Sequence, residues 1–332
     1  MSTRKIVVTG GAGYIGSMLV SELLRAGIRV SVVDDLWFGG ESVAPFLHFD
    51  GFELHKRDIC RPDALDGLLD GVECTVHLAA LVGFPACDAA GRDRVWAVNV
   101  TGTQNVHRAA VHAGVKRLIF ASSYSNYGES RDGEPVTEES PLYPKSTYAE
   151  SKIAAERFLL DRSGGDPAVT CLRLATVFGC SPRTRFDLMV NQFVLDAYVG
   201  KTLTLFQQDF KRSFVHVRDV ARAICRVMEA PVDTVRGEVF NIGSERLNTS
   251  KTELAEAVRK QAPSLLLDFR ESGSDSDMRS IHVSFEKARR ILGFEAHTSL
   301  EQGIEELLHV LRDGIVADPF SARYRNHVST VS

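Results

Sequence analysis

Thr9-Gly10-Gly11-Ala12-Gly13-Tyr14-Ile15-Gly16 is the stretch of this sequence around which the rest of the chain is organised. The β-branched run Ile6-Val7-Val8 precedes it, and a helical pattern over 17–25 follows it and stops at Gly27. Apolar β-branched runs are typical of buried strands, whereas the spacing of apolar residues in 17–25 is typical of a helix. The stretch therefore predicts a strand, a glycine-rich turn and a helix in that order.

Each glycine of the turn has a separate physical reason. Gly10 permits a tight turn, Gly13 has no side chain that would keep a diphosphate from the backbone, and Gly16 lets the helix lie close to the strand. The N–H groups at the start of the new helix, where Tyr14 and Ile15 stand, favour a phosphate. The turn therefore predicts a phosphate-binding site for a dinucleotide.

An acidic residue supports the dinucleotide interpretation. A second strand over 29–33 ends in Asp34, about 20 residues beyond the glycines, where a carboxylate would meet the adenosine ribose hydroxyls. A carboxylate repels a 2′-phosphate, so Asp34 favours NAD over NADP. Asp35 is either a second cofactor contact or a plain loop residue. A glycine loop without a ligand is the alternative, but strand, spacing and acid together favour the dinucleotide.

The bulk composition excludes several classes of protein. The chain has 332 residues, of which 44% are hydrophobic and 25% charged, as in ordinary soluble domains. A net charge of −4 gives no indication of a nucleic-acid or anionic-membrane partner. The six cysteines have no metal-ligand spacing, and no apolar run is long enough to span a membrane. The opening residues run straight into a strand, so no signal peptide is expected. We expect a cytoplasmic protein with free thiols and no metal site.

Later strands supply further candidate cofactor contacts. After a third strand over 51–55, Asp58 either bonds the adenine amino group or caps a helix over 64–69, and Ile59 lies beside it. A fourth strand, 75–80, ends in small residues that let the backbone approach the cofactor. Its candidate contacts are Leu78, Ala79 and Ala80.

Helical stretches separate the strands along the first half of the chain. A helix over 93–113 carries Asn99, another candidate cofactor contact, and precedes a fifth strand over 117–121. Alternation of this kind predicts right-handed crossovers and a doubly wound parallel α/β sheet. Ligands bind at the carboxyl ends of such strands, and Ser122 and Ser123 stand at one of them.

Tyr148 and Lys152 are four residues apart in a predicted helix that reaches residue 160, so they share one helix face. A phenol has an unperturbed pKa of about 10, and a nearby ammonium and an oxidised nicotinamide both favour the phenolate. Tyr148 is then the candidate base for a sugar hydroxyl, Lys152 stabilises the phenolate and holds the nicotinamide ribose, and Ser123 bonds the reacting oxygen. An isolated tyrosine–lysine pair is common by chance, but here it follows the dinucleotide turn and the serine strand end in order.

These motifs together resemble the extended short-chain dehydrogenase/reductases of the nucleotide-sugar epimerase/dehydratase family, and the resemblance covers nearly the whole chain. Its landmarks are the glycine turn, 77–80, Ser122-Ser123 with Tyr127-Gly128, Tyr148-x-x-x-Lys152, 212–219, 240–243, 277–279 and 292–294. The resemblance implies an NAD-binding Rossmann domain over 1–178 with 207–248 returning to it. It implies a smaller substrate-binding lobe over 179–206 and 249–316, followed by a loosely held tail over 317–332.

The same resemblance implies a nucleotide-diphosphate sugar as substrate and a homodimer formed by the helices near 93–113 and 148–160. Arg212 and Arg279 would contact the diphosphate or nucleoside, and arginine is the expected residue for forked bonds to phosphate. Asp219 is expected to cap a helix over 220–228.

Two departures from the family pattern bear on the reaction. Dehydratases and sugar-acid decarboxylases of the family carry an acidic residue after the Ser123 site, where this chain has Tyr124 and Ser125. The absence of a carboxylate at these positions disfavours dehydration and decarboxylation. It leaves 4-epimerisation ahead of 4-keto reduction and dehydration, with a non-catalytic NAD-binding protein as an alternative of another class. UDP-galactose 4-epimerase-like proteins carry Phe-Asn where this chain has Ala175-Thr176, and 181–187 also differs. Ser125, Thr176 and Asn191 are therefore candidate substrate contacts for a sugar that the sequence does not identify.

Overall fold

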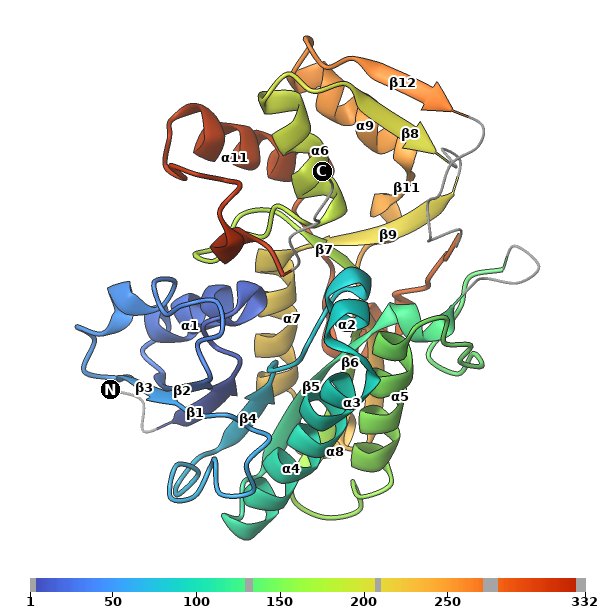
Figure 1. Cartoon of the computed structure of the whole chain (residues 1–332). Helices are drawn as coiled ribbons and strands as arrows, with labels where there is room; N and C mark the ends of the chain where they lie inside the picture. Colours follow the sequence, from blue (N-terminus) through green and yellow to red (C-terminus); the bar gives the residue numbers. More distant parts are fainter. Residues whose placement is uncertain (1–3, 129–133, 207–209, 271–279, 327–332) are drawn as a thin grey trace.

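A parallel sheet of seven strands forms the centre of the molecule (Figure 1), in a computed structural model that describes residues 4–128, 134–206, 210–270 and 280–326. The strand order is β10-β6-β5-β4-β1-β2-β3, and every pairing in this sheet is parallel. The strands are β1 (Lys5–Thr9), β2 (Arg29–Asp34), β3 (Phe52–Lys56), β4 (Cys74–His77), β5 (Arg117–Ser123), β6 (Ala168–Leu174) and β10 (Glu238–Ile242). The doubly wound Rossmann-type α/β sheet predicted from the sequence is confirmed.

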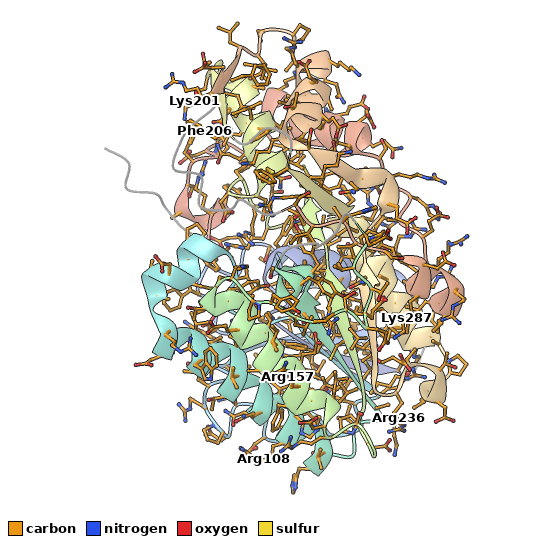
Figure 2. All side chains as sticks on the ribbon, turned by 90° about the vertical axis from the view of Figure 1, so that its right-hand side faces the viewer. Arg108, Arg157, Lys201, Phe206, Arg236 and Lys287 are labelled. Carbon is orange, nitrogen blue, oxygen red and sulfur yellow. The ribbon has the colours of Figure 1, made fainter. Side chains whose placement is uncertain are left out.

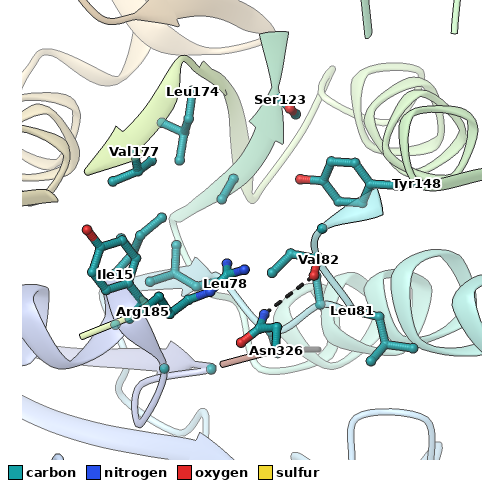
Figure 3. Close-up of a pocket in the computed structure, with 18 of the residues that line it drawn as sticks. Ile15, Leu78, Leu81, Val82, Ser123, Tyr148, Leu174, Val177, Arg185 and Asn326 are labelled. Carbon is teal, nitrogen blue, oxygen red and sulfur yellow. Dashed lines mark hydrogen bonds between the residues drawn. The ribbon is translucent and has the colours of Figure 1, made fainter. Parts of the chain in front are cut away.

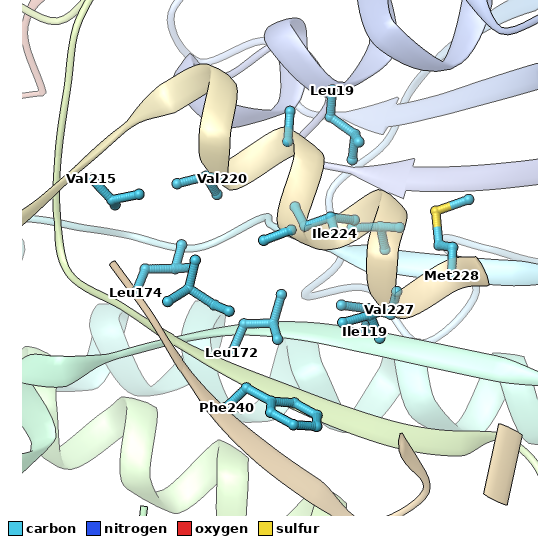
Figure 4. Close-up of a cluster of buried hydrophobic side chains, with 14 of the residues drawn as sticks. Leu19, Ile119, Leu172, Leu174, Val215, Val220, Ile224, Val227, Met228 and Phe240 are labelled. Atoms are coloured by element: carbon cyan, nitrogen blue, oxygen red, sulfur yellow. The ribbon is translucent and has the colours of Figure 1, made fainter. Parts of the chain in front are cut away.

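Helices cover both faces of this sheet, and its strands are buried on both sides. Ile6 and Val8 belong to the core cluster under α1 (Tyr14–Arg25) and α7 (Val217–Glu229), whereas Val7 belongs to the cluster on the opposite face. Figure 4 shows how α7 lays Ile224 and Val227 over Ile119 of β5. This alternation explains the continuous apolar runs in the sequence, because each strand packs on two layers of helices.

The opposite face carries a longer helical layer than the sequence predicts. It contains α2 (Phe84–Ala90), α3 (Arg92–Trp96), the π-helical segment η2 (Ala97–Gly102), α4 (Thr103–His112) and α5 (Thr147–Leu160). Three short helices lie elsewhere along the chain, namely η1 (Ala44–Phe46), η3 (Tyr124–Tyr127) and α8 (Val232–Val235). The predicted helix over 64–69 is wrong. Gly67 and Gly71 adopt positive φ angles of 72° and 68°, so the segment forms successive turns instead.

A second, smaller body lies above the carboxyl ends of the main strands (Figure 1). Its sheets are β11-β9-β7 and β12-β8, with bounds β7 (Thr176–Phe178), β8 (Leu203–Phe206), β9 (Lys211–His216), β11 (Asn248–Ser250) and β12 (Leu267–Arg270). Its helices are α6 (Met189–Tyr198), α9 (Lys251–Gln261) and α11 (Leu300–Arg312), while η4 (Glu245–Leu247) and α10 (Glu286–Leu292) lie nearby in the chain. β9 pairs with β7 and β11 rather than with the main sheet. The domain boundaries given above stay a prediction.

Two local predictions near this body need correction. α7 begins at Val217, and its first turn is capped by the His216 ring, which accepts a hydrogen bond from Arg218 N at 3.2 Å. Asp219 instead accepts hydrogen bonds from His297 N and Thr298 N, at 3.2 and 2.9 Å. Asp219 therefore joins α7 to the loop before α11 and does not cap the helix.

The C-terminal segment is held more firmly than predicted. The short helix η5 (Ala322–Tyr324) lies against the smaller body, where Phe186 N donates to Tyr324 O at 2.9 Å and the two rings meet edge to face. Residues 327–332 lie outside the described part of the chain. Within the described part, no helix combines the length and the apolarity needed to cross a membrane.

Candidate active site

A cavity of about 410 Å³ opens between the two bodies at the carboxyl ends of the main strands. This is the place where doubly wound sheets bind ligands. The predicted site residues that line the cavity are Gly10, Gly13, Tyr14, Ile15, Gly16, Asp34, Asp35, Asp58, Ile59, Leu78, Ala79, Ala80, Ser123, Ser125, Tyr148, Lys152, Thr176 and Arg212. Residues from many separate elements thus meet around one space.

Two predicted residues within the described part of the chain do not line it. Asn99, in η2, uses its amide on the loop after β4, accepting from Leu81 N at 2.8 Å and donating to Leu81 O at 3.0 Å. Asn191, fully buried in α6, bonds Gly179 N and Arg185 O at 3.0 and 2.9 Å. Both amides therefore brace loops at the cavity instead of facing it. Arg279 lies outside the described residues.

The glycine turn has the shape of a phosphate cradle. A Cβ at Gly10, where φ is 73°, would lie 2.6 Å from Ala79 N, and a Cβ at Gly16 would lie 2.2 Å from Gly10 O. At Gly13 the closest atom would be Gly10 O at 3.1 Å, with no second contact within 4 Å among the described residues. Gly10 and Gly16 are thus required by close backbone packing, whereas Gly13 keeps open the space over the turn that a dinucleotide diphosphate needs.

Gly13→Ala is therefore expected to weaken NAD binding at least about tenfold, because its methyl group occupies the space of the diphosphate. The free energy of unfolding should change by less than about 1 kcal/mol, since φ is −77° and only one contact tightens. Calorimetric titration with NAD and urea unfolding measure the two quantities. Gly16→Ala is the matched comparison and should destabilise the fold itself. Unchanged NAD affinity in Gly13→Ala would mean that the diphosphate does not approach this glycine.

The acidic residues near the turn are held by backbone groups. Asp34 accepts from Ala12 N at 3.0 Å and Leu36 N at 2.9 Å, and burial raises the pKa of its carboxyl group. Asp58 accepts from Cys60 N at 2.9 Å and also lines the cavity. Because no helix follows at 64–69, Asp58 stabilises a turn and does not cap a helix.

Hydroxyl groups gather at the other end of the cavity (Figure 3). Tyr148 lies in the first turn of α5, which Ser146 caps by accepting from Ala149 N. Ser123, the last residue of β5, shares a hydrogen bond of 2.8 Å with Ser125 Oγ. Tyr124 Oη shares one of 2.7 Å with Thr176 Oγ1, so the hydroxyls of β5, η3 and β7 form one polar wall.

The chain alone does not produce the predicted phenolate. Burial raises the pKa of Tyr148 to about 12, although an interaction with Ser123 acts in the opposite direction. Burial lowers the pKa of Lys152 to about 8, and its Nζ donates to Ala121 O at 2.8 Å, in the part of the cavity wall that both residues form. The predicted phenolate also requires an oxidised nicotinamide beside the phenol, so the role of Lys152 in lowering the phenol pKa stays a prediction.

A buried ion pair lies directly behind these catalytic candidates. Glu156, one turn beyond Lys152 on α5, pairs with Arg173 of β6 at 2.5 Å, and their side chains are 2% and 5% exposed. Ser122 Oγ donates to the same carboxylate at 2.6 Å, and Arg173 Nη1 donates to Tyr127 Oη at 2.9 Å. The pair therefore fixes the end of β5 against the helix that carries Tyr148.

The polar residues at the cavity that the sequence analysis missed include Arg183, Arg185 and Asn326. Arg185 makes a forked contact with Asp187, at 3.1 and 2.7 Å. The unusual segment 181–187 contained the signal, because two arginines in a buried loop need anionic partners. Asn326 had no such signal, since it lies in the segment predicted to be a loose tail.

A Rossmann sheet, a phosphate cradle and a tyrosine–lysine helix beside one cavity define a dinucleotide-dependent enzyme. The family model of the NAD dependent epimerase/dehydratase family matches residues 6–243. A UDP-glucose 4-epimerase of Mycolicibacterium smegmatis is 31% identical, with 93% of this chain and 99% of that protein covered. UDP-glucuronic acid decarboxylase 4 of Arabidopsis thaliana is 29% identical, with 95% of this chain and 70% of that protein covered.

Among solved structures, the UDP-glucuronic acid 4-epimerase of Bacillus cereus in complex with UDP-glucuronic acid and NAD superposes with a TM-score of 0.83. It is 25% identical, and the match covers 93% of this chain and 99% of that one. The chain belongs to the NAD-dependent epimerase/dehydratase family, an extended branch of the short-chain dehydrogenase/reductases, and its cofactor is NAD.

Proposed function

We propose that this enzyme is a nucleotide-diphosphate-sugar 4-epimerase that works through a transient 4-keto sugar. The observation that carries the proposal is the distribution of acids around the cavity. Among the described lining residues, the carboxylates are Asp34, Asp35 and Asp58, which lie at the end of β2 or just after β2 and β3, on the expected adenosine side. Beside Tyr148 stand hydroxyl groups instead. Dehydration needs a further acid near the sugar to move a second proton, whereas epimerisation needs one proton acceptor that later returns the proton.

The side chains of Tyr148, Ser123 and Lys152 can carry out and support that single proton transfer. NAD, when bound, would supply reversible hydride transfer with the sugar carbon, so the reaction would involve no net oxidation. Tyr148 receives the proton of the sugar hydroxyl and later gives it back, while Ser123 bonds the reacting oxygen and is itself oriented by Ser125. Lys152, buried and held by Ala121 O, keeps a positive charge below the site and holds the nicotinamide ribose.

The substrate would enter from the side of the smaller body. Arg212, at the start of β9, is buried and lines the cavity, as does Thr176 of β7. A guanidinium at this position suits the diphosphate of a nucleotide sugar. The identity of the nucleotide and the sugar is left to the experiment that follows.

Proton NMR of the purified protein with a panel of nucleotide sugars in deuterated water, without added cofactor, tests the proposal. The expected result is inversion at C4 with no deuterium entering carbon, because the hydride returns to the carbon it left. Deuterium at C5 or C6 with a keto product would establish a dehydratase instead. Conversion of a 4-keto sugar only when NADH is added would establish a reductase. Retained NAD with no conversion in any of these arms would favour a binding protein.

We also propose a homodimer in the cytoplasm. The helices α4 and α5 contact each other and lie side by side on one flank, where Figure 2 labels Arg108 and Arg157. Val111 of α4 is 48% exposed there, which suits a second copy of the chain. All six cysteines are free, which supports a reducing compartment. Light scattering should give twice the chain mass of 36.5 kDa, and a monomeric mass would refute the dimer.

A further inference from the structure

Arg183 has a buried guanidinium in the cavity wall, and one of its N–H donors makes no hydrogen bond to the described residues. The residue is 5% exposed, and its cation lies 3.9 Å from the centroid of the Phe38 ring. Its Nη2 donates to Asn326 Oδ1 at 2.9 Å. Its Nε is buried and makes no hydrogen bond to any of the described residues. Because a buried donor without a partner is unfavourable, this N–H indicates a ligand with acceptor atoms.

The position of Arg183 indicates which ligand that is. Phe38 follows β2 and the acidic pair Asp34-Asp35, so the guanidinium stands on the side where the adenosine half of NAD is expected. Burial and the neighbouring Arg185 lower the pKa of Arg183 to about 10, whereas the charges of Asp187 and Asp34 act in the opposite direction. Arg183 is thus still a cation at neutral pH, and Asp187 is already forked to Arg185. A second anion is needed there, and the diphosphate of NAD is the anion that the glycine cradle presents.

Asn326 fixes this guanidinium from the C-terminal segment. Its Oδ1 accepts from Arg183, its Nδ2 donates to Val82 O at 3.4 Å (Figure 3), and its backbone N donates to Asp187 Oδ2 at 3.1 Å. One residue near the end of the described chain therefore joins the loop after β4 to the arginine loop across the cavity.

We propose that Arg183 binds the diphosphate of NAD and that Asn326 is the positioning residue that holds Arg183 for this contact. The C-terminal segment 321–326 then acts as a strap that retains the cofactor. The inference depends on NAD binding and does not depend on which sugar reaction the enzyme performs.

The test is the dissociation constant for NAD, measured by calorimetry on full-length protein stripped of nucleotide. Arg183→Met should weaken NAD binding about 10- to 100-fold, and Asn326→Ala about three- to tenfold. In the Arg183→Met background, Asn326→Ala should have no further effect, because Asn326 acts through Arg183. A role of Asn326 in tail docking alone would persist in that background and would overturn the positioning role.

Two controls keep the result readable. Arg323→Ala breaks the exposed ion pair between the same segment and Glu41 and should leave NAD affinity within about twofold. Arg183→Lys keeps the charge but not the fork, so it should bind NAD with intermediate affinity, and it replaces the methionine variant if that variant does not fold.

Binding of UDP to the NAD-saturated protein separates the two diphosphate sites. UDP affinity should be unchanged in Arg183→Met. If UDP affinity falls while NAD affinity does not, Arg183 belongs to the substrate and the inference is overturned. Failure of every sugar in the NMR panel would refute the proposed reaction but not this inference.

Discussion

Tyr148→Phe is expected to lower turnover by about 10²- to 10⁴-fold while the protein continues to bind NAD. The phenol is the proposed acid–base group and lines the cavity with Ser123, and phenylalanine removes only its oxygen. The packing of the partly buried ring is preserved, so the fold should be maintained. The rate of C4 inversion by NMR and the amount of NAD that co-purifies with the protein measure the two effects.

Tyr124→Phe is the matched control for this variant. Tyr124 also lines the cavity, but its hydroxyl is paired with Thr176 Oγ1 at 2.7 Å. Loss of this hydroxyl should alter substrate binding and leave turnover within about tenfold. Full turnover by Tyr148→Phe would remove Tyr148 from the mechanism, and with it the proposed proton transfer.

Arg173→Met should lower the free energy of unfolding by about 3–5 kcal/mol, because it leaves the buried carboxylate of Glu156 without its partner. Both side chains are almost completely buried, and the guanidinium makes three contacts with that carboxylate, at 2.5, 3.2 and 3.3 Å. Urea unfolding at fixed protein concentration, without added nucleotide, measures the loss.

Replacing both partners should be less harmful than replacing one. The double variant Glu156→Leu with Arg173→Met removes the buried charge and should recover part of the stability that the single variant loses. Recovery should stay incomplete, because Ser122 and Tyr127 also lose partners. A loss below about 1 kcal/mol in Arg173→Met would show that the carboxylate finds another partner or water.

The site residues that the sequence analysis chose and that line the cavity depend on short-range spacing. The glycine turn, Asp34 at the end of β2 and the Tyr148–Lys152 pair each lie within one strand–turn–helix unit or one helix turn. Their geometry follows from the rise of a strand or helix, so spacing suffices to place them. Residue patterns can therefore indicate those site residues that belong to one such local unit.

The features that the sequence did not predict depend on contacts between distant segments. Asn326 meets Val82 across 244 positions, and no local pattern records such a contact. Asn99 and Asn191 were plausible ligand contacts by type, but their amides satisfy backbone groups of loops whose course the sequence does not reveal. The raised pKa of Tyr148 follows from burial in the assembled fold, which spacing along a helix does not report.

The smaller body has a consequence for the order in which the protein folds during synthesis. Its apolar core draws on residues from Phe178 to Phe214 and again from Leu247 to Leu311. Six of the seven main strands are complete once Leu174 has left the ribosome, whereas this second core must wait for α11. Nascent chains between these two lengths expose half of an apolar core, and that interval is when chaperones would be needed most.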